Sequence, residues 1–217
     1  MAAVQVRKHV VIAGTGRTGT TFLVELLTCL GLDTGFSPVE LEGRKNKLAR
    51  AGLEHDLQSD VCPYIVKSPS FHYQVDEVLD REDLKLERVL IPMRDLQAAA
   101  ESRRYVHSQG LARCSFLRRL SKRLRGRLGF PGGLVQPDLG LSQETVLVHQ
   151  LYNLVLSLAD SAIPVTLLRY PRLARDPAYL FWKLKPILGV VTFPEFETVF
   201  QATVRPALVH CFSENDR

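Results

Sequence analysis

The sequence predicts an α/β fold in which a single parallel β-sheet is flanked by helices. Two observations carry this prediction. Short apolar runs alternate with longer segments of helical periodicity along the 217 residues, as in strands joined by crossover helices. Each apolar run also leads into charged or hydroxyl-bearing residues, as expected where ligands bind beyond the carboxyl ends of parallel strands. The length suits one domain, residues 1–217.

These apolar runs and helical patterns predict four strands and the helices that follow them. The first half contains a strand over 9–14, a helix over about 19–31, a strand over 64–66 that leads into Lys67, and a helix around 73–79. The second half contains a strand over 88–93, a helix to about His107, a helix over about 142–160, a strand over 165–168, and a helix that Asp176 caps. The segment after this last helix allows no clear prediction.

The most informative segment is Gly14 to Phe22, GTGRTGTTF, between the first strand and the first helix. Free backbone N–H groups and the helix dipole favour an anion at such a position. The segment contains three glycines, Gly14, Gly16 and Gly19, and its threonines include Thr18, Thr20 and Thr21. The glycines allow close backbone approach, the threonines add hydroxyl donors, and Arg17 adds a permanent cation. The sequence therefore predicts a phosphate- or sulfate-binding loop rather than a turn with only a packing role.

Two common phosphate-binding patterns fit this loop incompletely. Gly14 and Gly19 have the spacing of the Walker A motif, but Thr20 occupies the position of its lysine. The glycines also match the dinucleotide pattern GxGxxG, for which Glu40 could bind a ribose. Glu40, however, does not end a convincing strand, and that pattern has no need for Arg17. A nucleotide kinase-like protein and a Rossmann protein remain the alternatives.

A third interpretation rests on several segments together. Residues 17–22, RTGTTF, resemble the 5′-phosphosulfate loop of the sulfotransferases that use 3′-phosphoadenosine-5′-phosphosulfate (PAPS). That family also has an arginine after a middle strand and a serine eight positions later, which Arg94 and Ser102 match. Residues 66–69, VKSP, and residues 167–190 resemble two further family segments, in the same chain order.

The last of these segments departs from the family pattern at Pro171 and Arg172, where Glu-Asp is usual. Taken together, the segments identify the chain as a member of the PAPS-dependent sulfotransferases. The resemblance implies a P-loop-containing nucleotide-hydrolase-like (sulfotransferase) architecture. It also implies transfer of a sulfuryl group from PAPS to a hydroxyl or amine of a small-molecule or glycan acceptor, including an anionic one. PAP is then the product, and no metal is implied.

The same resemblance assigns residues to the donor. The cofactor-binding residues are Gly16, Arg17, Thr18, Gly19, Thr20, Thr21, Phe22, Arg94, Ser102 and Tyr170. Arg94 and Ser102 would hold the 3′-phosphate. Arg17 and the loop amides would stabilise the leaving 5′-phosphate, and Lys67 would contact the transferred sulfuryl group.

The general base is assigned from the same resemblance. Cytosolic members carry a histidine at the position that Pro69 occupies here. Other branches use a glutamate that follows the phosphosulfate loop. Glu40 is the first choice as the catalytic base beside Lys67 and Arg17, with Glu42 and His72 as alternatives.

The charge of the chain suits anionic ligands, with a formal net charge of +5. Residues 103–137 contain nine Lys or Arg and no Asp or Glu, and their leucines recur at helical spacing. We expect this basic amphipathic helix to act as a lid or as part of the acceptor site. Aromatic residues are sparse there, which argues against nucleic acid as a partner.

The location is predicted from the cysteines and the apolar segments. The four cysteines form no CxxC pair or zinc-site spacing, so free thiols are expected, and Cys29 is expected to be buried in the first helix. No signal segment and no run long enough to span a membrane is recognised. The sequence therefore predicts a cytoplasmic protein without a transmembrane segment.

Overall fold

The computed structural model describes residues 6–46, 51–113, 130–135 and 140–209. These residues form an α/β fold with a four-stranded, all-parallel sheet in the order β2-β1-β3-β4, which confirms the predicted fold class. The strands are β1 Arg7–Ile12, β2 Ile65–Lys67, β3 Leu84–Met93 and β4 Val165–Arg169. All four run in one direction, so their carboxyl ends share one edge of the sheet.

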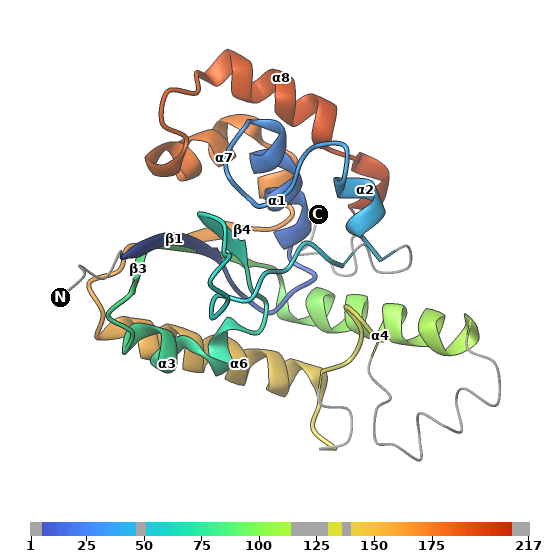
Figure 1. The fold of residues 1–217 in the computed structure, drawn as a ribbon. Coiled ribbons are helices and arrows are strands. Elements are labelled where there is room, and N and C mark those ends of the chain that lie inside the picture. The colour runs from blue at the N-terminus through green and yellow to red at the C-terminus, as the bar shows by residue number, and fades with distance from the viewer. Residues whose placement is uncertain (1–5, 47–50, 114–129, 136–139, 210–217) are drawn as a thin grey trace.

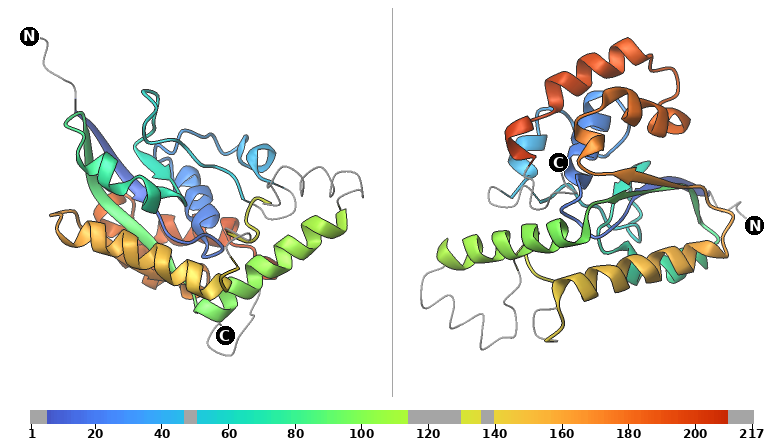
Figure 2. Two further views of the ribbon diagram at one scale, coloured as in Figure 1. Left: turned by 90° about the horizontal axis from the view of Figure 1, so that it is seen from below. Right: turned by 180° about the vertical axis from the view of Figure 1, so that it is seen from behind.

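Seven α-helices flank the sheet in the described part of the chain. They are α1 Thr20–Cys29, α2 Leu41–Arg44, α3 Val75–Leu79, α4 Leu96–Arg113, α6 Gln143–Ala159, α7 Pro177–Leu184 and α8 Phe193–Thr203. Helices α1, α7 and α8 cover one face of the sheet, and α3 and α6 cover the other (Figure 1). Helix α4 continues outward beyond the end of the sheet (Figure 2).

The core consists of two layers, one on each face of the sheet. Alternate residues of β1 belong to one layer or to the other. Val10 and Ile12 of β1 are fully buried against α1, α7 and α8. Val11 and Ala13 point the opposite way and pack in the cluster that contains α3 and α6. This alternation follows from the two-residue period of a strand, and each such Val or Ile contributes about 1.5–3 kcal/mol on burial.

Capping residues define the last two helices. The Asp176 carboxylate accepts a hydrogen bond from the Tyr179 amide at 2.8 Å, so Asp176 caps α7 as predicted. Thr192 and Glu195 form a capping box that starts α8, a helix that the sequence left without a prediction. Helix α8 buries Phe196 and Phe200 against the sheet face that α1 and α7 also cover.

Three expectations need correction or completion. Cys29 is the last residue of α1 and is exposed, so the prediction that it is buried is wrong. Most of the basic helix expected within residues 103–137 lies outside the described residues, which here include only the end of α4 and residues 130–135. Within the described residues, no helix has the length and apolar character needed to cross a membrane.

Candidate functional site

Glycines shape the loop between β1 and α1. Gly19 has a φ of +88°, and a Cβ atom there would lie 3.0 Å from the Leu173 side chain and 3.1 Å from that of Tyr170. A Cβ atom at Gly16, where φ is +69°, would lie 3.1 Å from Nη2 of Arg103. Both positions therefore require glycine for the backbone conformation and for close approach to neighbouring side chains.

Arg17 adopts a backbone conformation that is unfavourable for a residue with a side chain. Its φ is +61°, in the left-handed region, which costs about 1–2 kcal/mol. Its Nε atom donates a hydrogen bond to the hydroxyl of Ser102 on α4, with a distance of 3.0 Å. Burial lowers the pKa of Arg17, and the positive charge of Arg94 lowers it further. Because an arginine keeps its proton in proteins, the result is a concentrated positive charge beside the loop.

Most of the predicted donor-binding residues line one pocket, which we call the first pocket. The predicted residues that line it are Arg17, Gly19, Thr20, Thr21, Phe22, Arg94, Ser102 and Tyr170. They come from the loop, α1, the end of β3, α4 and the end of β4. The remaining wall includes Thr203, Val204, Arg205, Leu208 and Val209, from the end of α8 and the segment after it.

Arg94 connects two of these segments. Its Nη1 atom lies 3.4 Å from the carbonyl oxygen of Arg17, and its guanidinium carbon lies 4.7 Å from the ring centroid of Tyr170. Stacking on Tyr170 is a cation–π contact, and it restricts the orientation of the guanidinium plane. Tyr170 itself is mostly buried, with 8% of its surface exposed.

A second pocket lies on the other side of the loop. Its lining residues are Gly16, Arg17, Thr20, Thr21, Arg44, Asn46, Ala51, Gly52, Glu54, Lys67, Pro69, Arg103, Pro131 and Gly132. Arg17, Thr20 and Thr21 line both pockets. The loop therefore separates two spaces that share its cation and its hydroxyl groups.

Lys67 at the end of β2 is one of the most buried charged residues of this second pocket. Its Nζ atom lies 2.9 Å from Thr21 Oγ1, 2.5 Å from the carbonyl oxygen of Gly52 and 2.8 Å from Glu54 Oε1. Lys67 is only 2% exposed, so it is not a surface lysine at a strand end. Burial lowers the pKa of Lys67, and the carboxylate of Glu54 opposes that shift.

The carboxylate beside Lys67 belongs to Glu54, which the sequence did not single out. Glu54 follows a turn in which Gly52 and Leu53 both have positive φ, +132° and +65°. Its side chain remains 43% exposed while it pairs with Lys67. No recognisable motif marks this position, because the contact with Lys67 depends on the folded path of the segment that precedes β2.

The three predicted bases lie elsewhere. Glu40 precedes α2 and accepts hydrogen bonds from the backbone and hydroxyl of Ser37 at 3.0 and 2.7 Å, which lower its pKa. Glu42 pairs with Lys45 at 2.7 Å. His72 is half-buried, and burial lowers its pKa. None of the three is a described lining residue of either pocket, so each of these roles stays a prediction.

The other predicted loop residues are distributed around the two pockets. Gly16 lines the second pocket only. Thr18 is 1% exposed and is absent from the described lining of both pockets. Phe22 packs edge-on against Phe200 of α8, with a distance of 5.6 Å between ring centroids.

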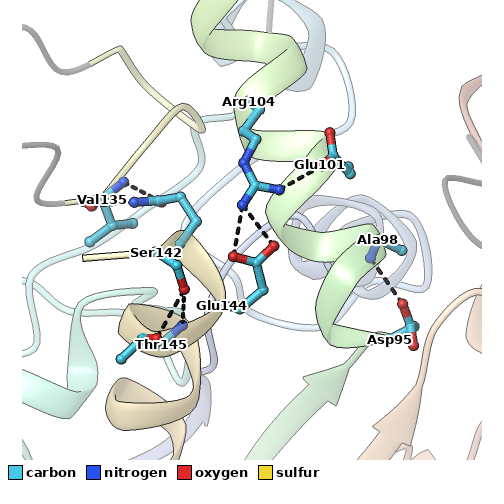
Figure 3. Close-up of polar contacts among 9 residues, drawn as sticks. Asp95, Ala98, Glu101, Arg104, Val135, Ser142, Glu144 and Thr145 are labelled. Carbon is cyan, nitrogen blue, oxygen red and sulfur yellow. Dashed lines mark hydrogen bonds and ion pairs between the residues drawn. The ribbon is translucent and has the colours of Figure 1, made fainter. Parts of the chain in front are cut away.

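Helix α4 carries Ser102 to the first pocket and Arg103 to the second. Its orientation is fixed by Arg104, whose Nη2 atom lies 2.7 Å from both carboxylate oxygens of Glu144 on α6 (Figure 3). Arg104 also contacts Glu101 one turn away, at 2.6 Å. The preceding residue of α4, Arg103, donates to the carbonyl oxygens of Thr15 and Gly133. Arg103 therefore ties the loop and residues 130–133 to the same helix.

Comparison of the chain with protein-family models found no match, and comparison with curated protein sequences found none either. The residues of the two pockets are therefore the basis on which a function is inferred.

Proposed function

We propose that this protein is a PAPS-dependent sulfotransferase with the P-loop-like architecture of that family. The observation that carries the proposal is that the loop and the Arg94–Ser102 pair, the two segments predicted to bind phosphate, line the first pocket together. Arg17 of the loop and Ser102 of the Arg94–Ser102 pair are 85 positions apart in sequence, yet they form a hydrogen bond. A donor with a 5′-phosphosulfate and a 3′-phosphate needs two separate anion sites in one pocket, whereas ATP needs only adjacent phosphate positions.

The residues of the first pocket fit such a donor. In the described part of the chain, no side chain caps the first turn of α1, so its amides remain available to an anion. Gly19 permits the left-handed backbone before α1 and its close packing against Tyr170. Arg17 supplies charge for the 5′-phosphate, and Arg94 with Ser102 supplies charge and a hydroxyl for the 3′-phosphate.

The second pocket supplies the groups that transfer requires. When bound, PAPS contributes a sulfuryl group on a phosphate leaving group. Lys67 neutralises charge on the sulfuryl oxygens, and Arg17 with the loop amides stabilises the charge left on the phosphate oxygen. Glu54 accepts the proton that the acceptor hydroxyl loses as its oxygen bonds to sulfur. Glu54 has this role in our proposal because it is the carboxylate in contact with Lys67.

Ligand-dependent thermal unfolding tests the proposal. We expect PAP, at about 100 times its dissociation constant, to raise the free energy of unfolding by about 2.7 kcal/mol. ATP or NAD at the same concentration should raise it less. Arg94→Ala should remove the preference for PAP over ATP. Arg113→Ala, which removes an exposed arginine at the C-terminal end of α4, should retain it.

The outcomes separate the alternatives. Equal stabilisation by PAP and ATP would contradict the proposal and favour a kinase-like protein, and stabilisation by NAD alone would favour a Rossmann protein. PAP-specific binding without transfer from PAPS to any of a broad set of hydroxyl and amine acceptors would indicate a non-catalytic nucleotide-binding domain.

A further inference from the structure

The described lining of the second pocket is strongly basic. It contains four cationic side chains, Arg17, Arg44, Lys67 and Arg103, and one carboxylate, that of Glu54. Its other described residues are glycines, threonines, an asparagine, an alanine and two prolines, without an aromatic side chain. Such a lining offers an apolar or aromatic acceptor little surface to pack against, and it favours a polar ligand that carries negative charge.

Three of the four cations already have strong polar partners or a role toward the donor. Both terminal nitrogens of Arg103 are hydrogen-bonded to backbone carbonyl oxygens. Lys67 pairs with Glu54 at 2.8 Å. Arg17 also lines the first pocket, where the donor phosphate is proposed to bind.

Arg44, at the end of α2, is in a different situation. Its side chain is 64% exposed at the rim of the second pocket. Its ion-pair partner Glu40, the residue that immediately precedes α2, is 3.8 Å distant. A surface pair of this kind contributes about 0–1 kcal/mol, so a ligand anion can replace Glu40 at small cost.

The backbone that carries Arg44 is nevertheless held firmly. The adjacent Lys45 side chain is only 3% exposed and lies 2.8 Å from Glu25 of α1 and 2.7 Å from Glu42. A Cβ atom at Gly52 would lie 2.5 Å from the carbonyl oxygen of Arg44, so the returning chain packs directly against this residue. The result is an exposed guanidinium on an anchored support, which reduces the entropy lost when it binds an anion.

We propose that the acceptor carries a carboxylate, phosphate or sulfate ester and that Arg44 binds this anionic group at the rim of the second pocket. The inference rests on the proposed sulfotransferase function and specifies its acceptor class. The hydroxyl to be modified then points inward to Lys67 and Glu54, while the anionic group stays near solvent. Arg44 acts as a specificity residue, since its guanidinium can bind the two oxygens of such a group simultaneously.

Matched pairs of probes with and without a free anionic group test this inference. The probes are tetragalacturonate and its methyl ester, glucose 6-phosphate and glucose, and phosphoserine and serine. Their dissociation constants are measured by calorimetry on the PAP-saturated protein, after PAP binding has been verified for each variant. At least one anionic probe should bind about tenfold more tightly than its neutral partner, and Arg44→Gln should remove that difference.

Two further variants refine the result. Arg44→Lys retains the charge but not the planar fork, and it should retain part of the preference. Lys183→Gln removes one positive charge from an exposed position on α7 and should leave the preference unchanged. PAP should bind to all three variants as it does to the original protein.

The other outcomes would contradict the proposed function, the anionic acceptor or the role of Arg44. If PAP does not bind the original protein, the proposed function is wrong, and so is the inference about the acceptor, because it rests on that function. If PAP binds and all three pairs show equal affinities, the acceptor inference alone is wrong. A preference that survives Arg44→Gln, or that Lys183→Gln also removes, would show that Arg44 is not the residue that recognises the anion.

Discussion

Arg17 Nε and Ser102 Oγ are 3.0 Å apart, which joins the loop after β1 directly to helix α4. The serine hydroxyl orients the arginine and can also donate to a phosphate oxygen. We expect Ser102→Ala to weaken PAP binding about tenfold, the size of effect expected for a lost hydrogen bond to a charged group. Calorimetric titration with PAP measures this change. Ser108→Ala, at an exposed position on the same helix, is the control, and equal affinities for PAP in the two variants would contradict the role of Ser102.

The positive φ of Arg17 leads to a prediction about stability. Alanine and glycine both remove the charged side chain, but only glycine adopts a φ of +61° without steric cost. Arg17→Gly should therefore be more stable than Arg17→Ala by about 0.5–1 kcal/mol, after allowance for the greater freedom of glycine in the unfolded chain. Urea unfolding of the two variants measures the difference, and both should lose PAP binding. An alanine variant as stable as the glycine variant would show that the loop relaxes to another conformation.

The sheet and the loop could be predicted because local sequence determines them. The continuous apolar run of β1 and the glycine and threonine spacing after it are visible without tertiary information. The parallel register then follows, and it aligns Ile12 of β1 with Lys67 of β2 at the same edge. The convergence of Arg94 and Ser102 on the loop was predictable for the same reason, since their strand ends beside β1.

Glu54 and the C-terminal wall of the first pocket could not be predicted in this way. The position of Glu54 depends on the left-handed turn at Leu53 and on the distant Lys67, neither of which leaves a periodic pattern in the sequence. The location of helix α8 depends on contacts such as that of Phe200 with Phe22. Such long-range contacts select among conformations that local propensity leaves nearly equal.

The Glu54–Lys67 pair allows a direct test of the general base. Glu54→Gln should lower kcat by about 10²–10⁴-fold, because the amide cannot accept the proton, while PAP affinity stays nearly unchanged. Glu40→Gln is the matched comparison, and the proposal expects it to retain activity. Full activity of Glu54→Gln together with loss of activity in Glu40→Gln would show that Glu40, and not Glu54, is the general base.

The contact between α1 and α8 should contribute strongly to the free energy of unfolding. Phe200 is 1% exposed and packs against Phe22 and Phe196. Phe200→Ala should reduce the free energy of unfolding by about 3–5 kcal/mol, because it removes buried apolar surface and leaves a cavity. Denaturant unfolding measures the loss, and Val190→Ala, at a position that is 96% exposed, should change it little. A small effect of Phe200→Ala would mean that α8 contributes little to the cooperative unit.

His9 gives the fold a predictable dependence on pH. It is 2% exposed on β1, and its Nδ1 atom donates to the Pro63 carbonyl oxygen at 2.7 Å. Within the described chain, its Nε2 atom is buried without a hydrogen-bond partner, so a second proton there would be unfavourable. Burial accordingly lowers the pKa of His9, although the hydrogen bond to Pro63 opposes the shift.

The sign of the effect follows from this lowered pKa. In the unfolded chain a histidine has a pKa of about 6.5, so the unfolded state binds more protons than the folded state just below that pH. The free energy of unfolding should be at its full value above about pH 6.5 and decrease as the pH falls through the lower folded pKa, by at most about 1.4 kcal/mol per pH unit for this group. His9→Asn retains an amide donor toward Pro63 but cannot titrate, so its unfolding free energy should vary less between about pH 7 and 5. Urea unfolding over this range measures the slope, with His149→Asn at an exposed position of α6 as the control. A slope in His9→Asn equal to that of the original protein would show that His9 does not cause the loss of stability in acid.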